Sequence, residues 1–275
     1  MKKDFGGNTA FVTGASSGIG MAYARRLAAD GRDLVLIARR REVLEELAED
    51  LRATHGVEAE ALAADLSAPE GLHAICDRVR DDRPGVLVHA AGFGTRGHLD
   101  DLDPAIVEAQ VYLHDMAGLL LTRAALPGMK ERASGEIVLV SSLGAFLTTA
   151  EYTVYSATKA FLNTFARGLR DELAGSGVRV QAVCPGLVKT GFMSTEFFAG
   201  FDFSAVPDAF WLSAEEVADE SLRRLRKRYK PVLVAGRKNR AFLNFLQFPL
   251  LGPAVMALIG RASRKRVARG LPALF

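Results

Sequence analysis

The sequence predicts an α/β fold, a doubly wound parallel sheet of about seven strands with helices on both faces. Two observations favour this fold. Short, continuously apolar runs alternate with stretches of helical periodicity along most of the chain, and strands that are apolar throughout are typical of a sheet covered on both sides. The composition, with 49% hydrophobic and 24% charged residues in 275, is that of a globular domain, and it excludes collagen, coiled coils and disordered chains.

The predicted elements follow one another in strict alternation. The strands are predicted at Asn8–Thr13, Asp33–Ala38, Val57–Ala64, Val86–Ala90, Glu136–Ser141, Val178–Val183 and Val232–Ala235. The helices, whose apolar residues recur three or four positions apart, are predicted at Met21–Ala28, Glu42–Leu51, Leu72–Val79, Pro104–Met129 and Val154–Leu173. A sixth helix starts at the capping box Ser213-Ala214-Glu215-Glu216. Units of this kind make right-handed crossovers into one sheet.

We expect one domain with an extension. Residues 1–236 form the sheet and its helices, including a phenylalanine-rich substrate loop at 190–212 that we expect to be mobile, and residues 237–275 form a basic and apolar C-terminal extension. Cys76 and Cys184 are too few for a disulfide framework or a cysteine zinc site, and no metal site is predicted. No apolar segment follows the first lysines, so we expect no secretory signal and a cytoplasmic location.

A glycine-rich turn follows the first strand, with the sequence Thr13-Gly14-Ala15-Ser16-Ser17-Gly18-Ile19-Gly20. Such a turn brings backbone N–H groups close to a pyrophosphate, whose charge the N-terminus of the next helix stabilises. The turn also contains Gly-x-Ser-x-Gly, which presents a nucleophilic serine in α/β hydrolases. That alternative needs a histidine late in the chain, and the last of the five histidines is His114. The turn therefore predicts a Rossmann-type dinucleotide site.

Three arginines, Arg39 to Arg41, follow the second strand. In dinucleotide-binding folds an acidic residue near this place binds the ribose hydroxyls of NAD, whereas an arginine accommodates the 2′-phosphate of NADP. The alternative is that the arginines are simply solvated at the start of a helix. Cations are mildly unfavourable at the start of a helix, where the helix dipole is positive, so the presence of arginines at this place favours a role in binding a ligand. The sequence predicts NADP(H) as the cofactor.

Tyr155 and Lys159 lie four residues apart and share one face of a predicted helix. A nearby ammonium favours the phenolate, so we expect Lys159 to lower the pKa of Tyr155 and make it a general acid/base. A Tyr-x-x-x-Lys pair alone is common and mostly marks an ordinary helix surface. Here Ser141 and Ser142 end a strand 13 residues before Tyr155, at the carboxyl edge of the sheet where ligands bind in this architecture.

Residues 8–235 resemble the short-chain dehydrogenase/reductase family, in particular its ketoacyl-reductase-like branch. The resemblance is carried by the glycine-rich turn, Asp65-Leu66, Gly92, Ser142, Tyr155, Lys159 and Pro185-Gly186 with Thr190, all in order. It implies that Tyr155 donates the proton to a carbonyl oxygen, that Ser142 hydrogen-bonds this oxygen, and that Lys159 perturbs the phenol and holds the nicotinamide ribose. The cofactor contacts that it implies, together with the arginines above, are Gly14, Ser16, Ser17, Gly18, Ile19, Gly20, Arg39, Arg40, Asp65, Leu66, Ala91, Gly92, Tyr155, Lys159, Pro185, Gly186, Val188 and Thr190.

The sequence departs from the family pattern at two histidines. His89-Ala90-Ala91-Gly92 replaces the usual Asn-Asn-Ala-Gly after the fourth strand. His114 stands 13 residues before Pro127, where the family usually has an asparagine that steadies the catalytic lysine through a water. A neutral imidazole both donates and accepts, so His114 is a candidate catalytic residue in proton relay. The alternative is a histidine packed in a helix and hydrogen-bonded once.

The C-terminal part of the chain is strongly basic. From Ser221 onwards there are 14 Lys/Arg and no Asp/Glu, whereas residues 1–220 hold 21 basic and 32 acidic residues. An uncharged stretch, 241–260, lies between two basic clusters and is interrupted by Pro249 and Pro253. Three interpretations stay open: helices packed over the substrate cleft or a neighbouring subunit, a segment in a membrane interface, or a membrane anchor.

These features predict an NADP(H)-dependent oxidoreductase that interconverts a ketone and a secondary alcohol on an apolar substrate, such as an acyl chain or a steroid-like ring. The alternative is a catalytically weak NADP-binding sensor or scaffold that uses its basic tail to bind a membrane or a partner. The expected partners are a small apolar carbonyl or alcohol substrate and no nucleic acid. Peripheral contact with the inner face of a membrane is the further expectation for the tail, and the resemblance implies a homodimer or homotetramer.

Overall fold

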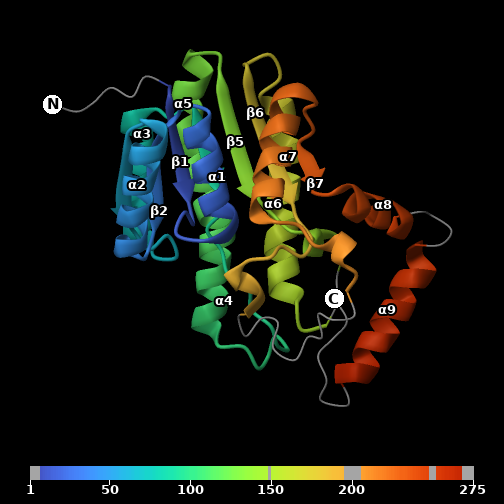
Figure 1. Cartoon of the computed structure of the whole chain (residues 1–275). Helices are drawn as coiled ribbons and strands as arrows, with labels where there is room; N and C mark the ends of the chain where they lie inside the picture. The colour runs from blue at the N-terminus through green and yellow to red at the C-terminus, as the bar shows by residue number, and fades with distance from the viewer. Residues whose placement is uncertain (1–6, 148–149, 195–205, 248–251, 268–275) are drawn as a thin grey trace.

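The computed structural model describes residues 7–147, 150–194, 206–247 and 252–267 of the chain. This part forms a seven-stranded parallel sheet in the order β3-β2-β1-β4-β5-β6-β7, so the chain winds from the centre to one edge and then to the other (Figure 1). The strands are β1 Thr9–Thr13, β2 Asp33–Ala38, β3 Ala59–Ala63, β4 Val86–His89, β5 Gly135–Val140, β6 Val178–Cys184 and β7 Val232–Val234. The predicted sheet is confirmed, and each strand ends within two residues of its predicted position.

Helices cover both faces of the sheet. Those on one face are α1 Gly18–Ala29, α2 Arg41–His55 and α7 Ala214–Lys227, and those on the other are α3 Pro69–Asp82, α5 Ala117–Glu131 and α6 Thr153–Glu172. The strands are mostly apolar because they serve both layers: in β1, Ala10 and Val12 join the first core while Phe11 joins the second. The capping box at Ser213 and Glu216 is present at the start of α7, as predicted.

The single helix predicted at Pro104–Met129 consists of three segments. α4 (Pro104–Val111) continues into a π-helical turn, η1 (Tyr112–Met116), and then into α5. A π turn holds an extra residue and so changes which side chains face inwards. In η1 it leaves His114 fully buried two residues before the partly exposed Met116.

The substrate loop predicted at 190–212 is only partly described, because residues 195–205 lie outside the described ranges. The described ends contain two short 3-10 helices, η3 Gly191–Ser194 and η6 Asp208–Phe210. Val188 and Leu212 form an isolated parallel bridge that brings these two ends together. The expected mobility of the loop stays a prediction.

The C-terminal extension begins with a helix that packs on the sheet. In α8 (Arg237–Leu246), Leu243 joins a small apolar cluster with Cys184 and Val234, and the Nη1 atom of Arg240 donates to Glu220 Oε1 at 2.7 Å. α9 (Gly252–Val267) lies further from the sheet, beyond α8 (Figure 1). No helix in the described ranges has both the length and the apolar character needed to cross a membrane.

Candidate active site

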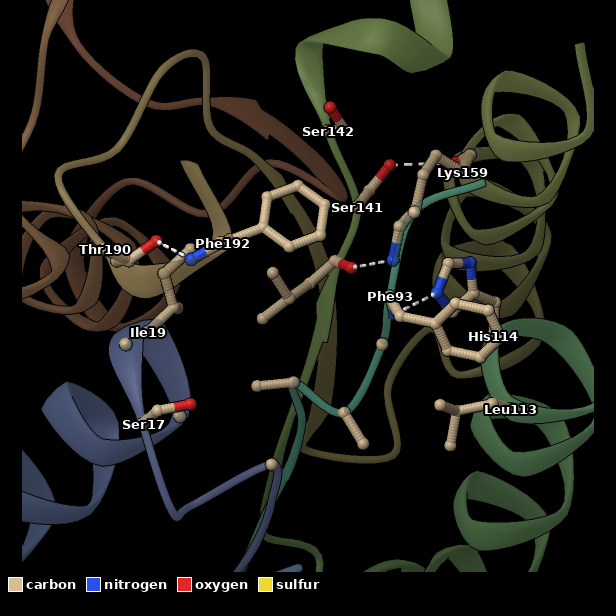
Figure 2. Close-up of a pocket in the computed structure, with 18 of the residues that line it drawn as sticks. Ser17, Ile19, Phe93, Leu113, His114, Ser141, Ser142, Lys159, Thr190 and Phe192 are labelled. Carbon is tan, nitrogen blue, oxygen red and sulfur yellow. Dashed lines mark hydrogen bonds between the residues drawn. The ribbon is translucent and has the colours of Figure 1, made fainter. Parts of the chain in front are cut away.

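A cavity of about 660 Å³ opens at the carboxyl edge of the sheet. In a parallel sheet all strands end at the same edge, so loops that are distant in the sequence meet there. Every residue that the sequence predicts for catalysis or cofactor binding lines this cavity: Gly14, Ser16, Ser17, Gly18, Ile19, Gly20, Arg39, Arg40, Asp65, Leu66, Ala91, Gly92, His114, Ser142, Tyr155, Lys159, Pro185, Gly186, Val188 and Thr190. Figure 2 shows Ser17, Ile19, Thr190 and Phe192 along one side of it, with His114 and Lys159 along the other.

The glycine-rich turn packs its backbone tightly and leaves the start of α1 available to an anion. A Cβ at Gly14 would lie 2.8 Å from the amide nitrogen of Ala91, and one at Gly20 would lie 2.3 Å from the carbonyl oxygen of Gly14. Within the part of the chain that the structure describes, Ser17, the N-cap of α1, makes no side-chain capping hydrogen bond, and the first turn of α1 holds no acidic residue. N–H groups at such a helix start stabilise negative charge, so the turn fits the pyrophosphate of a dinucleotide.

Charged side chains lie at the nucleotide end of the cavity. Arg40, on the surface after β2, donates from Nη2 to the carbonyl oxygen of Ser16 at 3.1 Å and to Ser16 Oγ at 2.9 Å. Arg39 lies in the same lining, and Asp65 follows β3. The hydrogen bond from Ser67 Oγ holds the pKa of Asp65 below its usual value against a smaller opposing effect of burial, and the charge of Arg39 adds to the lowering.

Ser142 and Tyr155 meet across the end of β5. Ser142 caps the short 3-10 helix η2 (Leu143–Phe146), where the N–H of Gly144 donates to its Oγ at 3.0 Å. A side-chain hydrogen bond joins Ser142 to Tyr155, which lies in the first turn of α6. The ring of Phe192 stacks on that of Tyr155, with their centroids 6.4 Å apart. The hydroxyl pair that the sequence predicts is therefore assembled beside an apolar wall.

The expectation of a lowered pKa for Tyr155 is wrong for this structure. Burial raises the pKa of Tyr155 to about 12, and the hydrogen bond with Ser142 opposes the rise. Lys159 Nζ lies 5.7 Å from the centroid of the Tyr155 ring and donates to the carbonyl oxygen of Val140 at 3.1 Å. Desolvation of the phenolate is therefore the largest cause of the shift.

Lys159 is itself strongly perturbed. It is only 5% exposed, and burial lowers its pKa to about 8, while the negative charge of Asp115 opposes the decrease. Sequence reasoning did not single out Asp115, which lies in the π turn. Burial raises the pKa of Asp115 to about 7, and its Oδ1 atom has no hydrogen-bond partner in the described structure. Its sequence gives little signal, because the same predicted helix carries other charged residues such as Glu108 and Arg123.

The two histidines that depart from the family pattern are both buried and neutral. His89 Nε2 donates to the carbonyl oxygen of Leu113 at 3.0 Å, and Thr13 Oγ1 donates to His89 Nδ1 at 3.1 Å. The backbone N–H of Phe93 donates to His114 Nε2 at 3.2 Å, and His114 Nδ1 lies 2.8 Å from Thr158 Oγ1. Burial, followed by the charge of Lys159, lowers the pKa of His89 to about 4 and places the pKa of His114 well below 6.5.

The comparison with protein families identifies this arrangement. The model of the short chain dehydrogenase family matches residues 8–198. The chain belongs to the short-chain dehydrogenase family. This short-chain dehydrogenase is 40% identical over 187 residues to the uncharacterized oxidoreductase YmfI of Bacillus subtilis (strain 168), and the match covers 68% of this chain and 77% of that protein.

Two further relatives extend the comparison. The chain is 37% identical over 193 residues to the very-long-chain 3-oxoacyl-CoA reductase of Anas platyrhynchos. That match covers 67% of this chain but 61% of the duck enzyme, less than two thirds of its length. Among solved structures, the short-chain dehydrogenase from Sphingobium yanoikuyae in complex with NADPH has a TM-score of 0.75 and 33% identity, over 94% of this chain and 95% of that chain. The protein is thus an oxidoreductase of a family that acts on alcohols and ketones.

The substrate end of the site contains residues that the sequence did not point to individually. Phe93, Leu147, Tyr152 and Phe192 line the cavity near Tyr155 in this short-chain dehydrogenase. Phe192 belongs to the phenylalanine-rich loop, which suggested an apolar substrate. The other three come from loops after β4 and before α6, where nothing in the sequence distinguishes a cavity residue from a core residue.

Proposed function

We propose that this oxidoreductase interconverts a ketone and a secondary alcohol on an apolar substrate with NADP(H), and that Tyr155 is its general acid/base. The observation that carries the proposal is the convergence of Ser142, Tyr155 and Lys159 on one cavity with an apolar wall. A phenol whose pKa burial raises to about 12 stays protonated at neutral pH, as an acid in the reductive direction must.

The chain supplies positioning and proton transfer. When bound, the nicotinamide cofactor supplies the hydride. Ser142 orients the Tyr155 hydroxyl and hydrogen-bonds the substrate oxygen, and Tyr155 donates its proton to that oxygen. The ammonium of Lys159 stabilises the phenolate that this transfer leaves. In the oxidative direction the same groups act in reverse.

The proposed preference for NADP(H) rests on Arg39 and Arg40. Both line the nucleotide end of the cavity, and Arg40 is already held against the glycine-rich turn by its bonds to Ser16. Guanidinium groups suit a 2′-phosphate because they offer several N–H donors in one plane. That the Sphingobium relative was solved with NADPH supports the same choice.

The proposed substrate is uncharged and bulky near its carbonyl group. Apart from Lys159, the charged residues of the described lining, Arg39, Arg40 and Asp65, all lie at the nucleotide end. Aromatic and leucine side chains around Tyr155 favour an acyl chain or a fused-ring ketone. The name of the duck relative, a very-long-chain 3-oxoacyl-CoA reductase, supports the first of these classes.

The test measures kcat/KM with NADPH and with NADH against a long-chain 3-oxoacyl thioester, a steroid ketone and an aryl ketone. We expect turnover of at least one of these ketones, a preference for NADPH of at least about tenfold, and a loss of about a hundredfold or more in Tyr155→Phe. Tyr229→Phe, which removes a hydroxyl bonded to the carbonyl oxygen of Val180, is the matched control. Tight NADPH binding without turnover of any ketone would favour the sensor alternative.

We also propose a cytoplasmic homo-oligomer whose basic extension touches an anionic membrane surface. Cys76 and Cys184 are both free thiols, which suits a reducing compartment. Exposed apolar side chains on α4 and η1, such as Ile106 and Met116, support a contact between copies. Leu258, 63% exposed, precedes the basic last turn of α9 and supports the membrane contact.

A further inference from the structure

A chain of three hydrogen bonds runs through His114 from one side of the active site to the other. The N–H of Phe93, in the loop after β4, donates to His114 Nε2 at 3.2 Å. His114 Nδ1 lies 2.8 Å from Thr158 Oγ1, and that hydroxyl donates to the carbonyl oxygen of Tyr155 at 2.9 Å. His114 and Thr158 are almost completely buried, so water does not compete for these bonds.

The direction of each bond fixes the protonation of the ring. A backbone N–H can only donate, so His114 Nε2 must accept and carries no proton. A carbonyl oxygen can only accept, so Thr158 uses its one hydrogen on Tyr155, and His114 Nδ1 must donate to Thr158 Oγ1. His114 is therefore the neutral Nδ1–H tautomer, whereas His89 must be the Nε2–H tautomer because its Nε2 faces the carbonyl oxygen of Leu113.

Both nitrogens of the His114 ring are occupied by hydrogen bonds within the protein. A relay that takes a proton from Lys159 needs a free lone pair, and the only lone pair of His114 accepts from Phe93. Protonation would break that bond in a buried place beside Lys159, and the charge of Lys159 and the closeness of His89 disfavour it further. The loop also packs directly on the ring, since a Cβ at Gly92 would lie 2.7 Å from His114 Nε2.

We infer that His114 is a positioning residue, which as a neutral Nδ1–H imidazole ties the Gly92–Phe93 loop to the first turn of α6 and so sets where Tyr155 and Lys159 stand. An asparagine or a glutamine does not bridge the same gap. The amide of asparagine ends at the level of Nδ1 and that of glutamine at the level of Nε2, so each reaches one partner only. The inference rests on the proposed function, because it matters for catalysis only if Tyr155 is the acid/base.

The first test removes the central hydroxyl and restores it. In Thr158→Val the buried N–H of His114 and the carbonyl oxygen of Tyr155 lose their partner, and we expect kcat to fall about ten- to a hundredfold while the KM for NADPH changes less than about threefold. Thr158→Ser keeps the hydroxyl and should recover most of the lost kcat. The matched control is Thr122→Val, which removes a fully buried hydroxyl without a hydrogen-bond partner among the described residues and should leave kcat unchanged. Equal kcat values for Thr158→Val and Thr122→Val would overturn the inference.

The second test uses the wild-type protein and needs no folded variant of Thr158. Nuclear magnetic resonance of protein with ¹⁵N-labelled imidazoles should show one buried histidine as the Nδ1–H tautomer, unchanged between pH 6 and pH 9. His114→Gln should remove its signal. A titration of His114 in this range, or the Nε2–H tautomer, would overturn the inference and favour relay. If Tyr155→Phe kept full turnover, the proposed function would fail, while the tautomer would still decide the role of His114.

Discussion

At the scale of single residues, the active site contains the ammonium of Lys159 in a buried position, where burial disfavours its charge. Lys159 is nearly inaccessible to solvent, and the hydrogen bond that the structure shows for its ammonium goes to the carbonyl oxygen of Val140. Burying a charge that is incompletely solvated destabilises the folded state, and such residues are retained where function needs them. We therefore expect a substitution of Lys159 to change both the catalytic rate and the stability of the folded protein.

We predict that Lys159→Met stabilises the protein at pH 7 by about 1–3 kcal/mol and abolishes turnover. The pKa of Lys159 is about 8 when folded, against the ordinary 10.5 when unfolded, so the folded state binds the proton less readily. The penalty is complete below pH 8 and disappears as the pH rises to 10.5, so the gain should shrink over that window. Urea unfolding of Lys159→Met and of the wild type at pH 7 and pH 10 measures this difference in the free energy of unfolding. Lys130→Met on the exposed side of α5 is the control, and an equal effect of both variants would contradict the prediction.

At the scale of elements, α8 is part of the support of the active site. Asn239 is buried against Gly186, where a Cβ would lie 2.8 Å from its Nδ2 atom, and Leu243 contacts the cluster around Cys184 at the end of β6. Phe242 packs edge-on against Phe210, the last residue of η6. The helix therefore backs both the Pro185–Gly186 loop and the described end of the substrate loop.

We predict that Leu243→Ala lowers the free energy of unfolding by about 2–4 kcal/mol, because it opens a cavity beside β6. Phe245→Ala, two residues later on the same helix, changes a side chain that is 49% exposed and should alter stability by less than about 0.5 kcal/mol. Chemical denaturation of both variants is the measurement. Similar values for the two would mean that α8 is not docked on the sheet.

At the scale of the whole molecule, the sequence predicted the fold and the residues that line the cavity, but it did not predict the pKa of Tyr155. Apolar runs such as Asp33–Ala38 mark strands because both sheet faces are covered, and parallel strands necessarily bring Ser142 and the glycine-rich turn to one edge. The π turn at Tyr112–Met116 escapes prediction, since one extra residue hardly changes apolar spacing. The raised pKa of Tyr155 depends on burial by loops distant in the sequence, which spacing does not reveal.

The positive charge of the protein is concentrated in its C-terminal part, and we predict that this charge drives binding to anionic membranes. Vesicles that contain phosphatidylserine should float with the protein at low salt, and vesicles of phosphatidylcholine alone should not. The combined variant Arg261→Glu, Arg264→Glu and Lys265→Glu reverses charges at exposed positions of α9 and should abolish co-flotation. Unchanged flotation of this variant would remove the proposed membrane contact.

The most direct test of the account follows the hydride and the proton donor together. NADPH deuterated at C4 of the nicotinamide, in the position from which the enzyme transfers, is incubated with the ketone that the wild type reduces best, and the product is analysed by mass spectrometry. We predict that the wild type forms an alcohol that carries one deuterium, and that Tyr155→Phe forms almost no deuterated alcohol in the same time. Equal deuterium transfer by both proteins, or no binding of NADPH at all, would contradict the central role given to the Tyr155 phenol.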